Sequence, residues 1–354
     1  MNLDELRQGI DAVDAQLVEL LKQRAAYVHQ VGELKKASGA PTFVPERENA
    51  LISKLLKLND GVLPEKSLLS IWRQIVSCSF NLEGNMRIGY LGPEGTWSHQ
   101  AALSRFGDSV ELVPYSSFAH IFAAVERNEV NYGVIPLENS THGNVVQAMD
   151  FFAHTHLSIC AQVHQSVQHC LMANIPAKEI RTIYSHPQVL GQCSAWLQQN
   201  YPEAEQIPTA SSTAAARMAV DKAADGAAAL GSPLAARLHG LNILAEQVQD
   251  VATNTTRFVV IGTQKTKPCG KDRTTICFTV PHKAGGLVDV LEYFRTYGIN
   301  IYCLDSRPTR DTAWEYLFYL DVEGHEEAEP LRSCVAELKA QCPVFKVLGS
   351  YPES

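Results

Sequence analysis

Asn254-Thr255-Thr256-Arg257-Phe258 runs without a break into the apolar stretch Val259-Val260-Ile261-Gly262. The β-branched run predicts a buried strand, which is a rigid base for residues at its mouth. A hydroxyl beside a fixed cation there suggests that the site donates a proton or a hydrogen bond to an anionic small molecule. Taken alone, the stretch is also compatible with a polar turn that carries one solvated arginine.

Composition limits the class of protein. A length of 354 residues allows about two to three domains. The hydrophobic content of 45% and charged content of 19% fit a globular protein with sizeable cores. A net charge of −8 without a Lys/Arg cluster argues against nucleic acid or an anionic membrane as partner. Because we find no signal-peptide pattern and no apolar run long enough to span a bilayer, we expect a cytoplasmic protein.

The cysteines and histidines do not predict a metal site. The nine cysteines are scattered and form no CxxC pair, which is typical of reduced thiols. His154, His156, His164 and His169 lie close in sequence but have no acidic or thiol partner at ligand spacing. We therefore expect no bound metal.

The N-terminal segment, residues 1–84, has a heptad-like apolar period. It predicts one helix of about 35 residues that ends near Gly39 and Pro41. At about 1.5 Å per residue this helix would be about 50 Å long, too long to be covered by two short helices, so we expect it to form a dimer. Its two apolar rows are Leu3, Ile10, Leu17 and Val31, and Leu6, Val13, Leu20, Tyr27 and Leu34.

Three cations interrupt this segment. Arg24 takes a row position between Leu17 and Val31, where a charge is costly unless it is paired with an anion. Lys35 falls on the same helix face, and Arg7 points toward a different cavity or the partner protomer. Two more helices are expected after Pro45 and Pro64, which makes a three-helix pocket for a dicarboxylate. The alternative is a coiled-coil arm in which Arg24 sets the register.

Four motifs give this segment a resemblance to the all-helical chorismate mutase family. They are L-R-x-x-I-D-x-x-D, L-L-x-x-R, G-E-L-K and P-E-R-E. The resemblance implies that cations hold the two carboxylates and the ether oxygen of chorismate: Arg7 of the partner, Arg24, Lys35 and Arg47. It also implies that Glu48 contacts the ring hydroxyl and that Ser79 and Glu83 face the substrate. The rearrangement needs no proton transfer, so restraint and charge stabilisation suffice for catalysis.

Two positions bear on the strength of this mutase activity. Val44 stands where many family members have Asp, which removes one polar contact to the substrate. Glu83 occupies a position that is Gln in some members, and a carboxyl donates to the ether oxygen only when protonated. We therefore expect mutase activity to rise toward acid pH and to lose that dependence in Glu83→Gln.

Residues 85–265 alternate short apolar runs with helical stretches, which predicts an α/β fold. Four runs end in polar turns, and strand ends in such folds are where anions bind. Each turn alone could be an ordinary helix N-cap, but together they predict one converging anion cleft. Gly89, Gly92 and Gly95 have GxxGxxG spacing, which is not a dinucleotide fingerprint. The polar residues at these turns include Thr96, Ser98, Glu138, Asn139, Ser185 and Gln192.

This segment resembles prephenate dehydratase through G-x-L-G-P-E-G-T-x-S, P-x-E-N-S, Y-S-H-P-Q-x-x-x-Q-C and N-x-T-R-F. The family fold has two lobes, like a periplasmic binding protein, with prephenate in the cleft. The resemblance implies that Thr256 is the catalytic hydroxyl, that Arg257 anchors a carboxylate and that Phe258 belongs to the site. It further implies that Asn139, Ser185 and Gln192 position the substrate, while Thr96, Ser98 and Glu138 line the cleft. The reaction requires neither a metal nor an organic cofactor.

Residues 270–354 follow a polar linker and predict a ferredoxin-like βαββαβ unit. The expected strands are 274–280, 299–306, 313–322 and 344–349, and the expected helices are 286–296 and 327–340. The bare amides at Gly285-Gly286-Leu287 could accept an anion such as an amino-acid carboxylate. The alternative is a structural cap or dimerisation domain.

The unit resembles an ACT domain, an amino-acid-binding regulatory module. Gly285-Gly286-Leu287 corresponds to the family's G-A-L, and Leu304-Asp305-Ser306-Arg307-Pro308 corresponds to its E-S-R-P. The resemblance implies that phenylalanine binds at an interface between subunits. Gly replaces Ala in the first motif and leaves the backbone approach open, and Asp replaces Glu in the second and shortens the reach.

Together the three resemblances imply a bifunctional enzyme of at least two subunits. It would convert chorismate through prephenate to phenylpyruvate, under feedback inhibition by L-phenylalanine. One rival is a dehydratase alone, whose helical arm serves dimerisation. The other is a non-enzymatic solute receptor or ligand-controlled regulator, which would have no need of the Thr256 hydroxyl.

Overall fold

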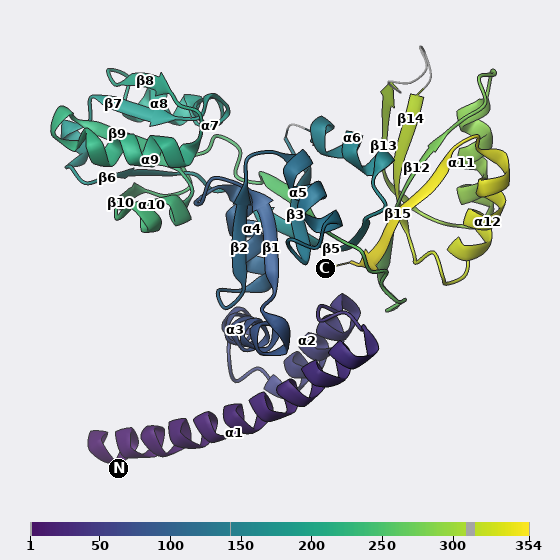
Figure 1. The fold of residues 1–354 in the computed structure, drawn as a ribbon. Helices are drawn as coiled ribbons and strands as arrows, with labels where there is room; N and C mark the ends of the chain where they lie inside the picture. The colour runs from purple at the N-terminus through teal and green to yellow at the C-terminus, as the bar shows by residue number, and fades with distance from the viewer. Residues whose placement is uncertain (1, 142, 309–315, 354) are drawn as a thin grey trace.

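The computed structural model describes residues 2–141, 143–308 and 316–353. A helical arm lies below two α/β lobes, and a third unit packs against the first lobe on the side away from the second (Figure 1). Within the described ranges, no helix has both the length and the apolar character to cross a membrane.

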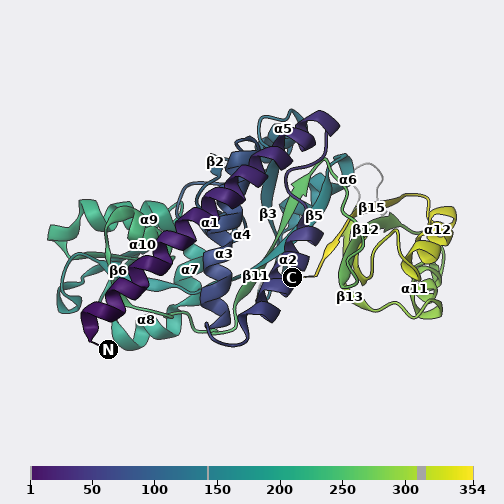
Figure 2. The ribbon, with the colours of Figure 1, turned by 90° about the horizontal axis from the view of Figure 1, so that it is seen from below.

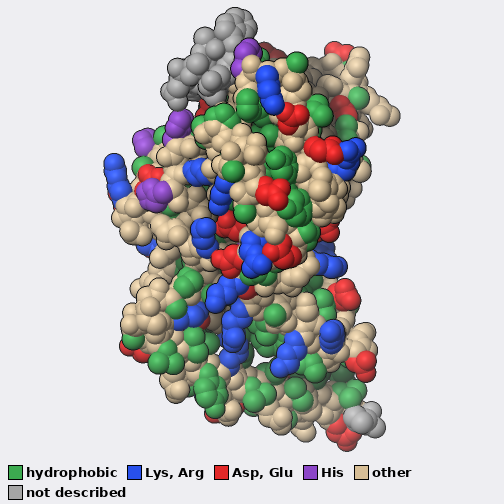
Figure 3. All heavy atoms as spheres, turned by 90° about the vertical axis from the view of Figure 1, so that its right-hand side faces the viewer, with side chains coloured by type: hydrophobic (Ala, Val, Ile, Leu, Met, Phe, Trp, Pro, Cys, Tyr) green, Lys and Arg blue, Asp and Glu red, His purple; other side chains and the backbone are tan. Residues whose placement is uncertain are grey.

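The arm consists of α1 (Leu3–Ser38), α2 (Pro45–Asn59) and α3 (Glu65–Gly84), which confirms the three expected helices. α1 begins with a capping box between Asn2 and Glu5. It ends at Gly39, whose φ of 69° is left-handed and costs glycine little. Within the described part of α1 only Val28 and Gly32 are buried. Both ribbon views show α1 running far past the other two helices (Figures 1 and 2), and hydrophobic side chains are visible on the lower part of the molecule, where the arm lies (Figure 3).

The first lobe is built on a mixed sheet with the order β2-β1-β3-β11-β5, and β4 pairs with β3. β1, β2 and β3 are parallel, whereas β11 runs antiparallel to both β3 and β5. The predicted apolar run, residues 259–262, is buried as expected, and Val259, Val260 and Ile261 are each 0% exposed. The strands are β1 (Arg87–Leu91), β2 (Glu111–Tyr115), β3 (Tyr132–Asn139), β4 (Gly143–Asn144), β5 (Ser158–Ser166) and β11 (Thr255–Gly262), and the helices are α4 (Trp97–Phe106), α5 (Phe118–Glu126) and α6 (Val146–His154).

The second lobe is inserted between β5 and β11, so two chain segments connect the lobes. Its sheet has the order β10-β6-β9-β7-β8. The strands are β6 (Cys170–Ala173), β7 (Thr182–Ser185), β8 (Glu205–Pro208), β9 (Ala227–Gly231) and β10 (Asn242–Ala245). The helices are α7 (Pro187–Gln192), α8 (Ser194–Asn200), α9 (Ser212–Asp221) and α10 (Pro233–His239), with 3₁₀ turns η1 (Ala177–Glu179) and η2 (Ala223–Asp225).

The C-terminal unit has the expected βαββαβ order, in a sheet of order β13-β14-β12-β15. Its last helix begins at Leu331, later than expected, because Pro330 directly precedes its first turn. Residues 313–315 of the expected third strand lie outside the described residues. The elements are β12 (Asp272–Thr279), α11 (Gly286–Thr296), β13 (Ile301–Pro308), β14 (Tyr316–Glu323), α12 (Leu331–Gln341) and β15 (Phe345–Pro352).

One aromatic side chain ties the arm to the first lobe. Phe43, between α1 and α2, is fully buried and its ring centroid lies 5.1 Å from that of Phe106 and 5.2 Å from that of Tyr132. The side chain of Gln264 donates to the carbonyl of Phe43 at 2.7 Å. The arm therefore shares a hydrophobic core with the lobe that follows it in sequence.

The C-terminal unit is joined to the same lobe at β5 and β11. Tyr319, Leu348 and Tyr351 belong to one buried cluster with Val259 and Ile261. A side chain at Gly349 would overlap the backbone of Ile159, so β15 and β5 approach closely there.

Candidate active sites

The arm brings four of the predicted mutase residues into two pairs. Arg24 donates to the Ser79 hydroxyl at 2.6 Å, and Lys35 donates to Glu83 at 2.6 Å. Lys35 also donates to the carbonyl of Thr42 at 2.9 Å, which fixes its position. Burial lowers the pKa of Arg24. Two cations and a hydroxyl therefore lie between α1 and α3, where they can bind an oxygen-rich anion, and Glu83 is the present partner of Lys35.

Glu48 differs from the expectation that it contacts a substrate hydroxyl. Its Oε1 accepts from Arg73 and, at 2.7 Å, from Arg105 of the first lobe, while its buried Oε2 has no hydrogen-bond partner among the described residues. Burial alone would raise the pKa of Glu48, but Arg105 and Arg73 outweigh it and hold the pKa below its usual value. The carboxylate is thus held by protein cations because the lobe places Arg105 against α2.

Arg7 and Arg47 are exposed and lie outside this cluster. Arg7 sits in the first third of α1, where its only recorded ion pair is with Asp4 at 3.7 Å, among the described residues. Arg47 is on the exposed side of α2. Arg7 lies on a part of α1 that this chain does not cover, and its role toward a partner protomer stays a prediction.

In the first lobe, Asn139 and Thr256 meet at the pairing of β3 with β11. The Asn139 amide donates to Thr256 Oγ1 and to Asn254 Oδ1, each at 2.8 Å. The backbone N–H of Thr141 donates to Asn139 Oδ1 at 3.1 Å. Because that N–H can only donate, the orientation of the Asn139 amide follows from its partners. Thr256 Oγ1 accepts from Asn139, which leaves its own hydrogen available for another acceptor.

Arg257 and Phe258 are not placed as expected. We predicted that Arg257 anchors a substrate carboxylate, but it is 5% exposed and pairs with Asp321 of β14 at 2.5 Å and with Glu138 at 3.3 Å. Successive side chains of a strand point to opposite faces, so Thr256 and Arg257 diverge. Phe258 is 1% exposed and packs in the core with Phe43. Glu138, expected to line the cleft, lies beside Arg257.

Two predicted cleft residues lie at the start of α4 and are turned toward the protein. Thr96 Oγ1 donates to the carbonyl of Leu91 at 3.0 Å and accepts from the N–H of His99 at 3.3 Å, as a helix cap. Ser98 is buried. The second lobe reaches this turn directly, since Ser232 donates to the carbonyl of Gly95 at 2.7 Å. The turn therefore connects the two lobes.

The second lobe contributes Ser185 and Gln192. Ser185 is fully buried and donates to the carbonyl of Leu230 at 2.8 Å. Gln192 Oε1 lies 2.8 Å from Nε2 of His169, a residue that the sequence analysis considered only as a metal ligand. Burial lowers the pKa of His169, so the ring is neutral at neutral pH.

His169 deserves a place among the functional candidates. It lies in the segment that connects β5 with β6, and its Nδ1 is buried without a hydrogen-bond partner among the described residues. Trp97 of the first lobe packs edge-on against it at 5.7 Å. It lies between Trp97 of one lobe and Gln192 of the other, and only the fold reveals that proximity.

The predicted regulatory residues of the C-terminal unit lie in two separate groups, one at the start of α11 and one on β13. Gly285, Gly286 and Leu287 line a cavity of about 300 Å³ together with Tyr316 and Phe318. A Cβ at Gly286 would lie 2.6 Å from the carbonyl oxygen of Pro281. The space that the Ala of the family motif would take is therefore occupied by backbone, and the approach is not left open as expected. Leu304, Asp305, Ser306, Arg307 and Pro308 form the second half of β13, where Arg307 pairs with Asp305 at 3.0 Å.

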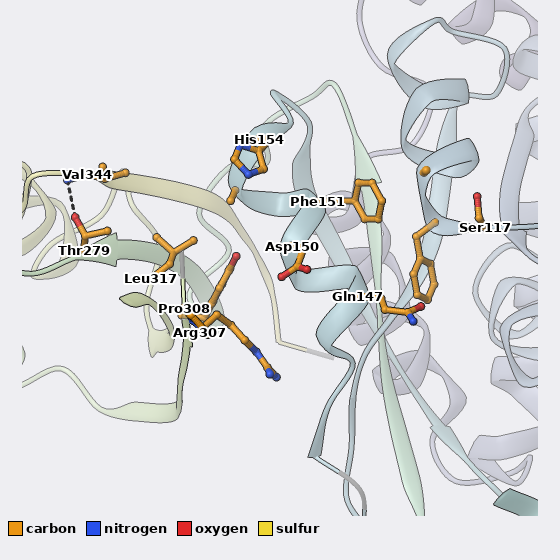
Figure 4. A pocket seen from close by; sticks show the side chains of 14 residues that line it. Ser117, Gln147, Asp150, Phe151, His154, Thr279, Arg307, Pro308, Leu317 and Val344 are labelled. Carbon is orange, nitrogen blue, oxygen red and sulfur yellow. Dashed lines mark hydrogen bonds between the residues drawn. The ribbon is translucent and has the colours of Figure 1, made fainter. Parts of the chain in front are cut away.

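A cavity of about 630 Å³ lies between the C-terminal unit and the first lobe. Figure 4 shows Arg307 and Asp150 extending toward the opening from opposite sides, with Phe151 and Gln147 on the lobe side and Leu317 on the other. The junction of these two units is therefore hollow at this edge.

Comparison with known proteins adds independent findings. Residues 6–84 match the chorismate mutase type II family, and residues 88–266 match the prephenate dehydratase family. The chain is 39% identical to a bifunctional chorismate mutase/prephenate dehydratase of Aquifex aeolicus (strain VF5), over 99% of this chain and 98% of that protein.

Two solved structures are similar in fold. A prephenate dehydratase of Arthrobacter aurescens in complex with L-Phe has a TM-score of 0.70 and 28% identity, covering 76% of this chain and 90% of that chain. A protein described as a novel type of quorum quenching acylase has the same TM-score and identity, and covers 76% of this chain and 98% of that chain. Because one fold can serve different reactions, the full-length relative carries more functional information than either structure.

Proposed function

The chain belongs to the bifunctional chorismate mutase/prephenate dehydratase family, and we propose that the clusters around Arg24 and Thr256 carry its two reactions. It rearranges chorismate to prephenate and then converts prephenate to phenylpyruvate, with loss of CO₂ and hydroxide.

For the mutase reaction, Arg24 and Lys35 bind the anionic substrate and stabilise charge on the breaking ether bond. Their pairing with Ser79 and Glu83 supports this role, because those hydrogen bonds hold both cations in position before the substrate arrives. Arg47 from α2 and Arg7 from a second copy complete the charge around the substrate. Substrate oxygens then replace Glu83 as the partner of Lys35.

For the dehydratase reaction, Thr256 is the proton donor to the departing hydroxide. The observation that carries this assignment is the Asn139 amide, which occupies one lone pair of Thr256 Oγ1 and leaves the hydroxyl hydrogen for the substrate. Aromatisation drives the reaction, so a weak acid is sufficient. Asn139, Gln192 and His169 are neutral and can bind oxygen atoms without repelling the substrate's carboxylates.

Replacement of Thr256 tests this proposal. Thr256→Ala should lower dehydratase kcat by roughly 10²-fold or more with little change in KM, whereas Thr256→Ser should retain most of the activity. Thr255→Ala, one residue away, is the matched control. Mutase activity measured on the same samples reports whether each variant is folded. A Thr256→Ala enzyme with near wild-type turnover would contradict the assignment.

The C-terminal unit is a phenylalanine-binding ACT domain in this proposal. Its support is the βαββαβ order and the cavity lined by Gly285, Gly286 and Leu287. L-phenylalanine should bind the full chain in titration calorimetry and inhibit dehydratase turnover.

The enzyme acts as a dimer or larger homo-oligomer, because the apolar rows of α1 face solvent in one chain. A second copy is the occupant that this face fits, since Arg7 on the uncovered part of α1 would then reach the partner's site. All nine cysteines are free thiols, which supports a cytoplasmic location.

A further inference from the structure

Two polar contacts connect the C-terminal unit with the strands that carry the dehydratase site. Asn144 of β4 donates to Asp305 of β13 at 3.0 Å. Arg257 of β11 donates to Asp321 of β14 at 2.5 Å. β13 and β14 are paired neighbours, in which Cys303 lies opposite Asp321. Both acceptors therefore belong to one two-stranded part of the C-terminal sheet.

On the lobe side, both contacts reach the same position of the strand ladder. Glu138 lies opposite Asn144 on β4 and opposite Arg257 on β11. The next pair along the ladder is Asn139 with Thr256, whose side chains are hydrogen-bonded at 2.8 Å. One residue along a strand corresponds to about 3.4 Å, so the two contacts end one step from the catalytic hydroxyl.

We propose that Arg257 is a positioning residue for Thr256, and that the Asn144–Asp305 and Arg257–Asp321 contacts transmit ligand binding at the C-terminal unit to the dehydratase site. This inference rests on the proposed function, since it assumes that Thr256 is catalytic and that the unit binds phenylalanine.

The Arg257–Asp321 pair is suited to transmit movement because it is buried and is the shortest ion pair that either residue makes among the described residues. Arg257 lies 3.3 Å from Glu138, and Asp321 lies 3.8 Å from Arg273. Arg257 is 5% exposed and Asp321 is 3% exposed, and a buried charge without its partner is costly. Asp321 also accepts from the Thr275 hydroxyl at 2.6 Å, which ties it to β12. A displacement of β14 therefore takes Arg257 with it, and β11 follows.

The cavity at the other edge of this junction gives the displacement room. Packed interfaces change between discrete arrangements, and a void of about 630 Å³ allows one unit to rotate against the other. Arg307 borders this cavity (Figure 4) and pairs with Asp305, the acceptor of Asn144. A ligand that engages the second half of β13 thus acts on a residue that contacts the dehydratase lobe directly.

The test uses the full chain and three variants. In Asn144→Ala we expect the Kd for L-phenylalanine to stay within about 3-fold of wild type, while inhibition of dehydratase kcat at saturating phenylalanine weakens by about 5-fold or more. Arg257→Met should lower uninhibited kcat by about 10-fold or more with KM within about 3-fold, and Arg257→Lys should recover part of that loss. Mutase activity of the same samples serves as the folding control.

Tyr319→Phe is the matched control for Asn144→Ala. It removes a hydrogen bond across the same junction, from the Tyr319 hydroxyl to the carbonyl of Met149, but that contact ends on α6 and not on the ladder. Saturating phenylalanine should inhibit the dehydratase kcat of Tyr319→Phe as strongly as that of wild type. Equal loss of inhibition in both variants, or full inhibition of Asn144→Ala, would overturn the proposal. If the unmodified chain neither binds phenylalanine nor responds to it, the regulatory part of the proposed function fails, and this transmission route fails with it.

Discussion

The junctions on either side of the dehydratase lobe each contain a buried arginine, but their surroundings differ. At the arm junction, Arg105 of the lobe pairs with Glu48 of the arm and stacks over the ring of Phe43, 4.8 Å from its centroid. At the C-terminal junction, Arg257 pairs with Asp321, and a cavity of about 630 Å³ opens at the edge. The first junction has a cluster of aromatic rings and a cavity of about 350 Å³ beside Arg73 and Arg105, which is smaller than the cavity at the second junction.

We infer from this difference that the arm is fixed to the lobe, whereas the C-terminal unit can change its position relative to the lobe. Phe43, Phe80, Phe106 and Tyr132 pack ring against ring at the arm junction, where displacement would break the shared core. The C-terminal junction has strong polar contacts beside empty space, as expected for units that change their relative position. At the arm junction, Arg105 of the lobe pairs with Glu48, a predicted mutase residue. At the C-terminal junction, Asp321 pairs with Arg257, which is next to Thr256.

The largest expected effect comes from the aromatic cluster. Phe43→Ala should lower the free energy of unfolding by about 3–5 kcal/mol, because it leaves a cavity in a shared core. Denaturant titration measures the loss, and mutase activity should fall more than dehydratase activity. Leu58→Ala, at a position of the same arm that is 70% exposed, is the control and should be close to neutral. A loss in Phe43→Ala no larger than in the control would show that the arm is not fixed at this point.

Removal of Arg105 should have a smaller effect. Arg105→Met takes one of the two cations from Glu48 and should cost about 1.5–3 kcal/mol of stability, since Arg73 remains. It should lower mutase kcat/KM and spare dehydratase kcat/KM. Arg127→Met, at an arginine whose side chain is 73% exposed, is the matched control. An equal decline in both activities would indicate general destabilisation in place of a specific link.

The pH dependence of stability should reveal the same contact. The pKa of Glu48 lies below its ordinary value of 4.5, so its pairing stabilises the folded chain above about pH 4.5 and is lost as the pH falls through the lower, folded-state pKa. Near neutral pH, the free energy of unfolding of wild type should exceed that of Glu48→Gln by about 1–2 kcal/mol. This difference should shrink below about pH 4.5. A gap that widens on acidification would contradict this sign.

The smallest effect is expected at the edge of the adjustable junction. Tyr319→Phe removes one hydrogen bond to Met149 and should cost about 0.5–1.5 kcal/mol, with both activities retained. Hydrogen exchange should show faster exchange in α6 and unchanged exchange in α1. A loss as large as that of Phe43→Ala would mean that the two junctions are equally rigid.

Local patterns in the sequence predicted much of this molecule. The apolar period of α1, its end at Gly39, and the βαββαβ order followed from spacing and breaker residues. The α/β order of residues 85–265 followed from the alternation of short apolar runs with helical stretches. These features depend on contacts within one element or on the general geometry of α/β folds.

The misplaced residues depend on contacts between units. No local pattern links Glu48 to Arg105, and nothing in the sequence around Phe43 shows that it enters the core of the next unit. The orientation of Arg257 could have been predicted, because alternation along a strand places it opposite to Thr256. Its partner Asp321, which lies in another unit, could not.

The uncovered stretch of α1 should make one of the two activities of this enzyme depend on protein concentration. If a second copy supplies both the cover for Leu3–Leu20 and the side chain of Arg7, mutase activity depends on the association equilibrium, while the Asn139–Thr256 pair lies within one chain. Dilution through the dissociation constant should then lower mutase activity per molecule and leave dehydratase activity per molecule nearly constant. The ratio of the two rates would report the concentration of the enzyme, and prephenate supply would fall before prephenate consumption does.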